Sequence, residues 1–597
     1  MSVLVNNCKI ISLLLLVASV AGPVGAAQPA PVRDCELSET CEHLPDGSRR
    51  RRPAVEPETP EPRPVNPDAV PRVPFTAPDP TVPVPDRWRI MESLGLTENW
   101  YDPYHQNTLK GDKPVYGDDW FFSLNLISDT VLEPRSVPTP VGPQSTTDPG
   151  SIDIFGGNDQ LIAAETLIAG LIFYQGDTVF RPPDYEFRLT LAYNYNRVEA
   201  DEIRFLRIDP GRGTTRRDSH VGVQELFADM HLRNVSDRYD FDSIRFGIQP
   251  FNADFRGFLF QDVQLGVRLF GNRENNFWQY NLAWFRRLEK DTNSGLNDIG
   301  KSLRDDDIFI ANLYRQDWPV LGFTSQATVV HNRNRETDIL FDNNGFLTRP
   351  ASLGLERPRE YDVTYLGLNG DGHFGRLNLT LSGYLALGSE ENAVFTGLDS
   401  DIRAGFLAAE LGMDFDWLRG RVSALWASGD EDPFDDESNG FDAIFENPVF
   451  AGADTSYWIR QNVPLVGGGG VALAGRNGVL ASLRPSKEQG QSNFTNPGIR
   501  LLGVGVDMDL TPQTRLSGNL NQLWFDDPAV LAVARNQGGV SRGIGLDASL
   551  ALIWRPLASQ NIVLRFSAAV LKPASGFKDL FGDDSQYSVL ANLIFAY

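Results

Sequence analysis

The chain has 597 residues, a formal net charge of −24 at pH 7 and a mean hydropathy of −0.26. So acidic a chain lacks the basic patches that nucleic-acid binding requires, and we expect no nucleic-acid partner. Its three cysteines and six histidines include no Cys-x-x-Cys-His sequence, which excludes a covalently attached c-type haem, and they do not supply the ligands of a structural zinc site. We expect no metal or other cofactor.

The first 27 residues have the pattern of a secretory signal peptide. Lys9 precedes the apolar run 10–21, and the small residues Gly25, Ala26 and Ala27 follow it. The run is shorter than the roughly twenty apolar residues of a membrane-spanning helix. We therefore predict export from the cytoplasm and cleavage after Ala27.

Residues 28–86 are predicted to be a disordered, Pro-rich periplasmic linker. Twelve prolines between positions 53 and 85 withhold backbone N–H groups, and the segment has little apolar surface to bury. Cys35 and Cys41 bracket a short acidic stretch, so in an oxidising periplasm they either close a small disulfide loop or remain unpaired thiols. The basic run Arg49–Arg52 either contacts anionic headgroups or a periplasmic partner, or is simply solvated.

Residues 87–117 form a short pre-barrel segment with an unusual aromatic content. The stretch 88–94 suggests one or two helical turns before Gly95, and Asn99–Tyr104 reads Asn-Trp-Tyr-Asp-Pro-Tyr. A plain linker would not carry so many Trp and Tyr side chains. We expect this segment either to enter the periplasmic mouth of the following domain as a small plug or to pack against its rim.

Residues 118–597 carry a repeated alternation of apolar and polar side chains that predicts β-strands. In the last strand, Tyr587–Tyr597, every second residue is apolar or aromatic and none is charged. The strand resembles the closing strand of bacterial outer-membrane barrels, whose terminal aromatic residues, here Phe595 and Tyr597, are read by the insertion machinery. Elsewhere the polar faces carry Arg, Asp and Glu, which disfavours a soluble sandwich and favours a barrel with lipid outside and water inside.

About eighteen segments fit this pattern, with counts from sixteen to twenty remaining open. Long and short connections alternate between them, as in barrels with short periplasmic turns and long outer loops. The longest connection, 430–496, begins with an acidic run and contains several aromatic residues, so it either folds inward as a constriction or covers the outer mouth. We predict an all-β, antiparallel, up-and-down transmembrane barrel with both of its ends in the periplasm.

A barrel of this size encloses an aqueous channel unless it is plugged. Charged residues on the polar faces are the candidates for lining that lumen. Their signs mix, so they predict no selectivity, and the alternative is that they pair across neighbouring strands and stiffen the wall. The candidates are Arg188, Glu225, Asp229, Arg245, Arg268, Arg287, Arg376, Glu410, Asp414, Arg421, Asp507, Asp509, Arg515, Asp547 and Arg565.

Three short stretches resemble the alginate-export family of outer-membrane barrels. They are Gln224–Asp229, Ile244–Gln249 with the following Asp262, and Ala424–Asp430, which leads into the long acidic loop. The resemblance implies an eighteen-strand barrel whose lumen passes an anionic polysaccharide outward. The chain departs from that pattern in its Pro-rich arm and in a lumen that is not uniformly basic, although an acidic polymer would favour a positive conduit.

Together these patterns predict a bacterial outer-membrane channel or exporter that gives passive passage to a polar or charged solute or polymer. The alternatives are a barrel sheath around a separate multihaem cytochrome, and a structural barrel whose arm tethers the envelope. Expected partners are outer-membrane lipid and lipopolysaccharide, the barrel-assembly machinery and a periplasmic partner of the arm. We expect no enzyme, because no nucleophile motif accompanies His220, His231, His331 or His373.

Overall fold

The computed structural model divides into two compact units, 1–79 and 80–597. In the described part of the chain, no helix is long and apolar enough to cross a membrane. The structure describes residues 41–43, 49–51, 94–95, 98–104, 107–140, 155–176, 182–237, 240–351, 353–452, 455–461, 463–466, 469–471 and 488–597.

The first unit contains a small antiparallel hairpin. Strand β1 (Cys41–His43) pairs with β2 (Arg49–Arg51), with Cys41 opposite Arg51. These six residues include no proline, so their backbone groups are free to pair, unlike those of the Pro-rich stretch that follows. The predicted signal peptide, Cys35, the rest of the linker and residues 88–93 lie outside the described residues.

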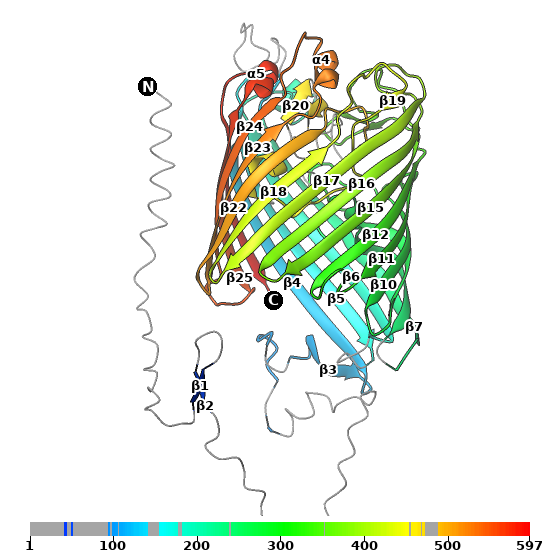
Figure 1. Cartoon of the computed structure of the whole chain (residues 1–597), viewed down its shortest axis with the longest axis vertical. Helices are drawn as coiled ribbons and strands as arrows, with labels where there is room; N and C mark the ends of the chain where they lie inside the picture. The colour runs from blue at the N-terminus through cyan, green and yellow to red at the C-terminus, as the bar shows by residue number, and fades with distance from the viewer. Residues whose placement is uncertain are drawn as a thin grey trace, which may run out of the picture. The chain divides into compact units, whose positions relative to one another are not determined.

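Eighteen long strands close into one antiparallel barrel in the described part of the second unit. Figure 1 shows the closed wall that they form. Each strand pairs with the next along the chain, and the last pairs with the first to close the ring. The predicted fold class is confirmed. The strands are β4 (Trp120–Ser136), β5 (Asp159–Gln175), β6 (Tyr185–Ala200), β7 (Thr215–Asn234), β8 (Phe241–Asn252), β9 (Gln261–Arg273), β10 (Trp278–Arg286), β11 (Asp306–Arg315), β12 (Phe323–Asn334), β15 (Tyr361–Phe374), β16 (Leu377–Glu390), β17 (Ser400–Phe415), β18 (Leu418–Ala427), β22 (Ile499–Thr511), β23 (Thr514–Trp524), β24 (Gly543–Trp554), β25 (Ile562–Pro573) and β26 (Gln586–Ala596).

Shorter strands and helices lie beside the barrel strands or in the connections between them. Strand β3 runs along the start of β4, and β19 joins β17 in parallel. Within the described parts of the connections there are two small hairpins and three short helices. Their bounds are β3 (Lys110–Tyr116), β13 (Leu340–Phe341), β14 (Leu347–Arg349), β19 (Glu437–Ser438), β20 (Val463–Val466), β21 (Gly469–Val471), α3 (Tyr457–Arg460), α4 (Ala529–Arg535) and α5 (Ser575–Phe581), with a 3₁₀ turn at Pro210–Arg212.

The two ends of the barrel differ in their connections. At one end, which we call the short-turn end, β15 and β16 are joined by only two residues, and Gly375 adopts the positive φ of 65° that so tight a turn requires. The other, the long-loop end, carries α4, α5 and β19 (Figure 1). The chain ends at the short-turn end, beside the start of the barrel, as the alternation of connections predicts.

Alternate residues of each strand face outward and inward. On β16, Leu381, Leu385 and Leu387 point outward and are exposed, whereas Ser382 and Tyr384 point inward and are buried. Exposed aromatic side chains lie near both ends of the outer wall. Those near the short-turn end include Tyr185, Phe187, Phe415 and Trp554, and those nearer the long-loop end include Tyr195, Trp284 and Phe309. An apolar wall between two aromatic belts is the surface that a membrane requires.

The described pre-barrel residues pack against the barrel rim, one of the two placements that the sequence left open. The Asn107 amide donates hydrogen bonds to the Tyr597 hydroxyl at 2.8 Å and to the Trp100 carbonyl at 2.9 Å. The Tyr104 hydroxyl donates to Asn561, in the turn between β24 and β25. The Lys110 ammonium lies 4.4 Å from the centre of the Tyr597 ring. These contacts hold the last residue of the chain at the seam between β26 and β4.

Leu381 tests the assignment of the outer face, because it is 42% exposed there. Arginine at this position would place a charge against hydrocarbon, so Leu381→Arg should lower the free energy of unfolding by about 2–4 kcal/mol. Leu381→Met keeps the surface apolar and should change it by less than about 1.5 kcal/mol. Urea unfolding from lipid vesicles measures both variants, and equal stabilities would show that this face does not meet hydrocarbon.

Candidate functional site

The barrel interior is the candidate site, and the predicted lumen residues carried by strands all have the inward register. Arg376 lies instead in the turn between β15 and β16 and is exposed at the rim. Arg287, directly after β10, and Asp547, on β24, are completely buried and do not line water. They differ from the expectation because loops fold over them from the long-loop end.

Two inward-folded segments form what we call the plug. They are residues 253–260, between β8 and β9, and the described part of 441–461, between β18 and β22. The segments run side by side. The backbone N–H of Gln261 donates to the Phe445 carbonyl at 2.8 Å, and that of Asn447 donates to the Gly257 carbonyl at 2.9 Å. The sequence left two placements open for the long connection, an inward constriction or a cover over the outer mouth, and its described part agrees with the first.

Aromatic side chains join the plug to the inner wall. The Phe258 ring lies 5.0 Å from that of Phe406 on β17 and 5.3 Å from that of Phe450. The Phe441 ring stacks on that of Phe406 with 5.2 Å between the ring centres. Near the long-loop end the inner wall itself is apolar and buried, for example at Ile402 and Ala404. Packed side chains, with a large apolar cluster among them, therefore fill this half of the described interior, whereas the sequence left open whether the channel is plugged.

Polar contacts fasten the plug to β15 and β16. The Tyr365 hydroxyl donates to the Asp442 carbonyl at 3.0 Å, and the Tyr384 hydroxyl donates to the Asp254 carboxylate at 2.9 Å. The same carboxylate accepts the backbone N–H groups of Gly257, Phe258 and Leu259, which bends the first plug segment into a compact turn. Both plug segments are thereby tied to one side of the wall.

A second set of contacts ties the helix α3 to the opposite side. The Asp547 carboxylate accepts the backbone N–H of Trp458 at 2.8 Å, at the first turn of the helix. Arg460 forms an ion pair with Glu133 on β4 at 2.7 Å, and the Tyr457 hydroxyl donates to the Ser136 carbonyl at 2.8 Å. The role of Asp547 is thus to anchor the plug. The plug spans the interior from β8 and β9 to β24 and β4.

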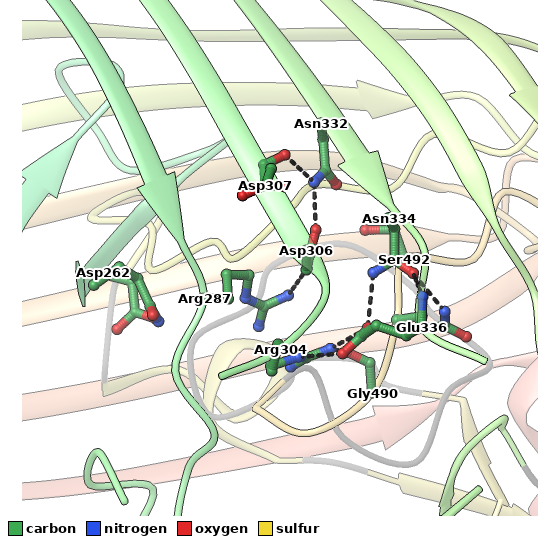
Figure 2. Close-up of polar contacts among 12 residues, drawn as sticks. Asp262, Arg287, Arg304, Asp306, Asp307, Asn332, Asn334, Glu336, Gly490 and Ser492 are labelled. Atoms are coloured by element: carbon green, nitrogen blue, oxygen red, sulfur yellow. Dashed lines mark hydrogen bonds and ion pairs between the residues drawn. The ribbon is translucent and has the colours of Figure 1, made fainter. Parts of the chain in front are cut away.

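A buried ion network locks the loops at the long-loop end, as Figure 2 shows. Arg304 and Glu336 form two parallel hydrogen bonds of 2.8 and 2.9 Å, and Arg304 also donates to the Gly490 carbonyl at 2.9 Å. Arg349 pairs with the same Glu336 at 2.9 Å, and Arg287 pairs with its strand neighbour Asp306 at 3.0 Å. The network joins three loops that are far apart in the sequence.

Burial alone would raise the pKa of the Glu336 carboxyl. Arg304, assisted by Arg349 and a hydrogen bond from Asn334, outweighs this effect and lowers the pKa to about 2. Glu336 is therefore ionised at every physiological pH. A buried carboxylate with two arginine partners keeps its charge and holds the return limb of the long loop, residues 488–493, through the Arg304 contact.

The short-turn half of the inner wall carries paired charges. On one side, Arg188 lies 2.8 Å from Glu186 and 3.5 Å from Glu225, and Arg245 lies 2.8 Å from Asp229. This agrees with the interpretation that charges pair across neighbouring strands. Arg268 has aromatic neighbours instead: its guanidinium lies 4.4 Å from the Phe270 ring and 5.3 Å from the Phe251 ring, and it donates to Asn281 at 2.7 Å.

The facing wall repeats this pairing. Arg421 lies 3.0 Å from Asp507 and 3.7 Å from Glu410, while Arg515 lies 2.6 Å from Asp509. Asp414 pairs with Arg419. Arg565 also faces inward, from β25, and is half-buried. Most of the predicted lumen charges therefore meet an opposite charge close by.

Arg256 reaches from the plug towards the short-turn half. Its guanidinium donates to the Thr380 hydroxyl at 2.5 Å and lies 3.5 Å from Asp371 and 3.8 Å from Glu410. Thr380, on the inward face of β16, is consequently only 4% exposed. Arg256 joins the plug to the paired charges of the wall and stands at the boundary between the apolar core and the polar half of the interior.

Sequence reasoning missed the residues that build the plug and its lock. Asp254, Arg256, Arg304 and Glu336 lie in connections, where strand alternation gives no information. One signal was present: the short connection 253–260 reads Ala-Asp-Phe-Arg-Gly-Phe-Leu-Phe, and so apolar a loop needs a surface to pack on. Apart from the backbone N–H groups that Asp254 binds in its own turn, the partners of these four charged residues come from other segments and leave no local pattern.

Comparisons with known proteins return solved structures only. No family model matches the chain, and no curated protein matches it. The chain is similar to Pseudomonas aeruginosa OccK7 (OpdD), with 11% identity over 80% of this chain and 98% of that chain and a TM-score of 0.45. It is also similar to P. aeruginosa OprD, with 12% identity over 80% of this chain and 95% of that chain and a TM-score of 0.41. A BenF-like porin of Pseudomonas fluorescens Pf-5 matches with 11% identity over 80% of this chain and 98% of that chain and a TM-score of 0.42. The resemblance to the alginate-export family stays a prediction.

The buried pair Arg304–Glu336 should be essential for stability. Glu336→Gln leaves the Arg304 guanidinium buried without a full counter-charge and should cost about 3–5 kcal/mol of unfolding free energy. Because the pKa of Glu336 is lowered from 4.5 to about 2, its contribution is complete above pH 4.5 and is lost as the pH falls towards 2. Urea titrations from pH 7 to pH 2, with hydrogen exchange of residues 488–493, measure both effects.

Asp509→Asn is the matched control for that variant. It removes a carboxylate from the pair with Arg515, whose side chains are 51% and 45% exposed, and should change stability by less than about 1 kcal/mol. If the two variants were equally stable, the network at the long-loop end would not hold the loops.

Asp430, at the root of the long loop, gives a pH dependence of the opposite sign. Burial and the nearby Asp435 raise the pKa of its carboxyl from 3.8 to about 7. The folded state holds the proton of this carboxyl more tightly than the unfolded state does. The resulting contribution to the free energy of unfolding is therefore complete below pH 3.8 and is lost as the pH rises through 7. Asp430→Asn should leave the melting temperature unchanged at pH 3 and raise it at pH 8. The exposed Glu431→Gln should shift neither value, and a lower melting temperature of Asp430→Asn at pH 8 would contradict the assignment.

Proposed function

We propose that the chain is a passive channel of the bacterial outer membrane that admits small polar solutes through a barrel narrowed by its plug. The observation that carries this proposal is the sidedness of the wall. Its outer face is apolar between two aromatic belts, while the short-turn half of its inner face carries paired charges. Hydrocarbon outside and water inside account for both faces. The proposal involves no chemical step.

The plug favours a small solute over a polymer. Its aromatic contacts with Phe406 and its anchors at Asp547 and Glu133 already occupy the interior that an extended polysaccharide would have to cross. The same occupation disfavours a sheath around a cytochrome, which needs an interior empty enough for a second protein. Tethering of the envelope would depend on the arm, and it stays an alternative role of residues 28–86.

Paired charges favour solutes of low net charge. Arg188, Arg245 and Arg421 each lie beside a carboxylate, so the wall offers many hydrogen-bonding groups but little net field. A single-sign ring would select ions of the other sign. We infer that neutral or zwitterionic polar molecules fit this wall better than a strongly anionic or cationic solute.

The proposed orientation follows from the connections. The short-turn end, where the chain terminates, faces the periplasm together with the arm, and the long-loop end faces outward towards lipopolysaccharide. Phe595 and Tyr597 are proposed to present the insertion signal to the barrel-assembly machinery. A periplasmic partner of the arm also belongs to this proposal.

Conductance in planar lipid bilayers tests the proposal. The purified protein should give steps of fixed size, because each barrel would provide one permanent path of its own. Replacing residues 441–461 by a short Gly/Ser linker removes half of the plug and should raise the step several-fold, since wide barrels of sixteen to eighteen strands leave an aqueous channel.

Deletion of residues 28–86 is the matched control and should leave the step unchanged. Circular dichroism of both variants shows whether the barrel has formed. A silent bilayer with the folded wild-type protein would contradict the channel, and an unchanged step in the folded plug variant would contradict the role of the plug.

A further inference from the structure

A long apolar groove lies on the outer wall of the barrel, beneath the pre-barrel segment. Its volume is about 1010 Å³. The segment 101–104 forms one side, and the strands β4 to β7 form the floor through Leu126, Leu167, Leu191 and Val221. A space of roughly thirty water volumes lined by such side chains has few partners for water.

The groove faces outward and is separate from the lumen. Leu126, Leu167 and Leu191 have the outward register of their strands and are exposed, as is Val221. The inward neighbour of Leu191, Ala192, is buried. The groove is therefore continuous with the apolar wall between the aromatic belts, and its occupant must come from the surrounding layer.

Polar groups gather at one end of the groove, where the pre-barrel segment meets the turn between β24 and β25. The Tyr104 hydroxyl donates to Asn561 there, and the Tyr597 hydroxyl lies at the same rim. Among the described residues that line the groove, Asp102 is the one with an acidic or basic side chain. Its carboxylate accepts the backbone N–H of Tyr104 at 2.9 Å. An apolar trough with one polar, negatively charged end matches an amphiphile with a cationic group.

We propose that this groove binds one phospholipid with an amine-bearing headgroup, its acyl chain along β4 to β7 and its ammonium near Asp102. The inference rests on the proposed membrane location of the barrel. The bound lipid fills the space that the pre-barrel segment leaves above the wall. It thereby supports the seam at which Asn107 and Tyr597 join. An anionic lipid is disfavoured by the carboxylate.

Native mass spectrometry of the full chain tests the proposal. Delipidated protein is offered phosphatidylethanolamine and phosphatidylglycerol in equal amounts in detergent. The wild-type protein should retain one phosphatidylethanolamine, at least about tenfold more often than phosphatidylglycerol, which corresponds to about 1.4 kcal/mol. Asp102→Asn should keep lipid binding but reduce that preference towards equality.

Ala169 and Ala163 supply a matched pair of variants. Both face outward on β5, but only Ala169 lines the groove. Ala169→Trp fills the groove with an apolar ring and should reduce the retained lipid at least about tenfold, whereas Ala163→Trp should retain it like the wild-type protein. Equal retention by the two variants, or no retained lipid on the wild-type protein, would overturn the proposal.

Conductance of the same samples separates this inference from the proposed function. Conductance steps without any retained lipid would overturn the groove proposal alone. A protein that proved soluble without detergent and gave no steps would overturn both. Retention of both lipids in equal amounts by the wild-type protein would refute the role of Asp102.

Discussion

The closed ring of backbone hydrogen bonds is the constraint on which the rest of the structure depends. Its last joint is the pairing of β26 with β4, where Leu126 and Tyr597 exchange backbone hydrogen bonds of 3.2 and 2.8 Å. A sheet closed in this way has no open edge, so its wall can present apolar side chains to hydrocarbon without exposing unpaired N–H or C=O groups. The Asn107 amide holds the Tyr597 side chain at the same joint.

Closure of eighteen strands creates a second problem, because so wide a ring cannot be filled by the side chains of its own wall. The chain solves it near the long-loop end by folding the segments 253–260 and 441–461 inward onto Phe406 and its neighbours. The buried pair Arg304–Glu336 then holds the return limb of the long loop at Gly490. The same arrangement stabilises the barrel and narrows any path through it, so stability and permeability are coupled in this fold.

Much of the fold was predictable because strand alternation is a local property. The last strand shows this well: Val589, Ala591 and Leu593 face outward as their spacing predicts, and Asn592 faces inward beside Asp129. Pairing of charges across neighbouring strands was one of the two interpretations that the sequence left open, and Arg245 and Asp229, whose strands follow each other in the chain, form such a pair. Arg287 and Asp547 share the same inward register, yet each is covered by the inward-folded loops.

The sequence by itself determined the strand period and the face that most strand residues occupy, because these depend on neighbours one or two residues away, and it gave the number of strands only to within sixteen to twenty. It did not determine which part of the interior is dry. That was decided by the tertiary structure, through contacts such as Arg304 with Gly490 and Asp254 with Tyr384, whose partners lie more than a hundred residues apart. A charge on an inward face lines water or anchors a loop according to whether such a distant segment covers it, and burial of that kind has no signature in a strand's own residues.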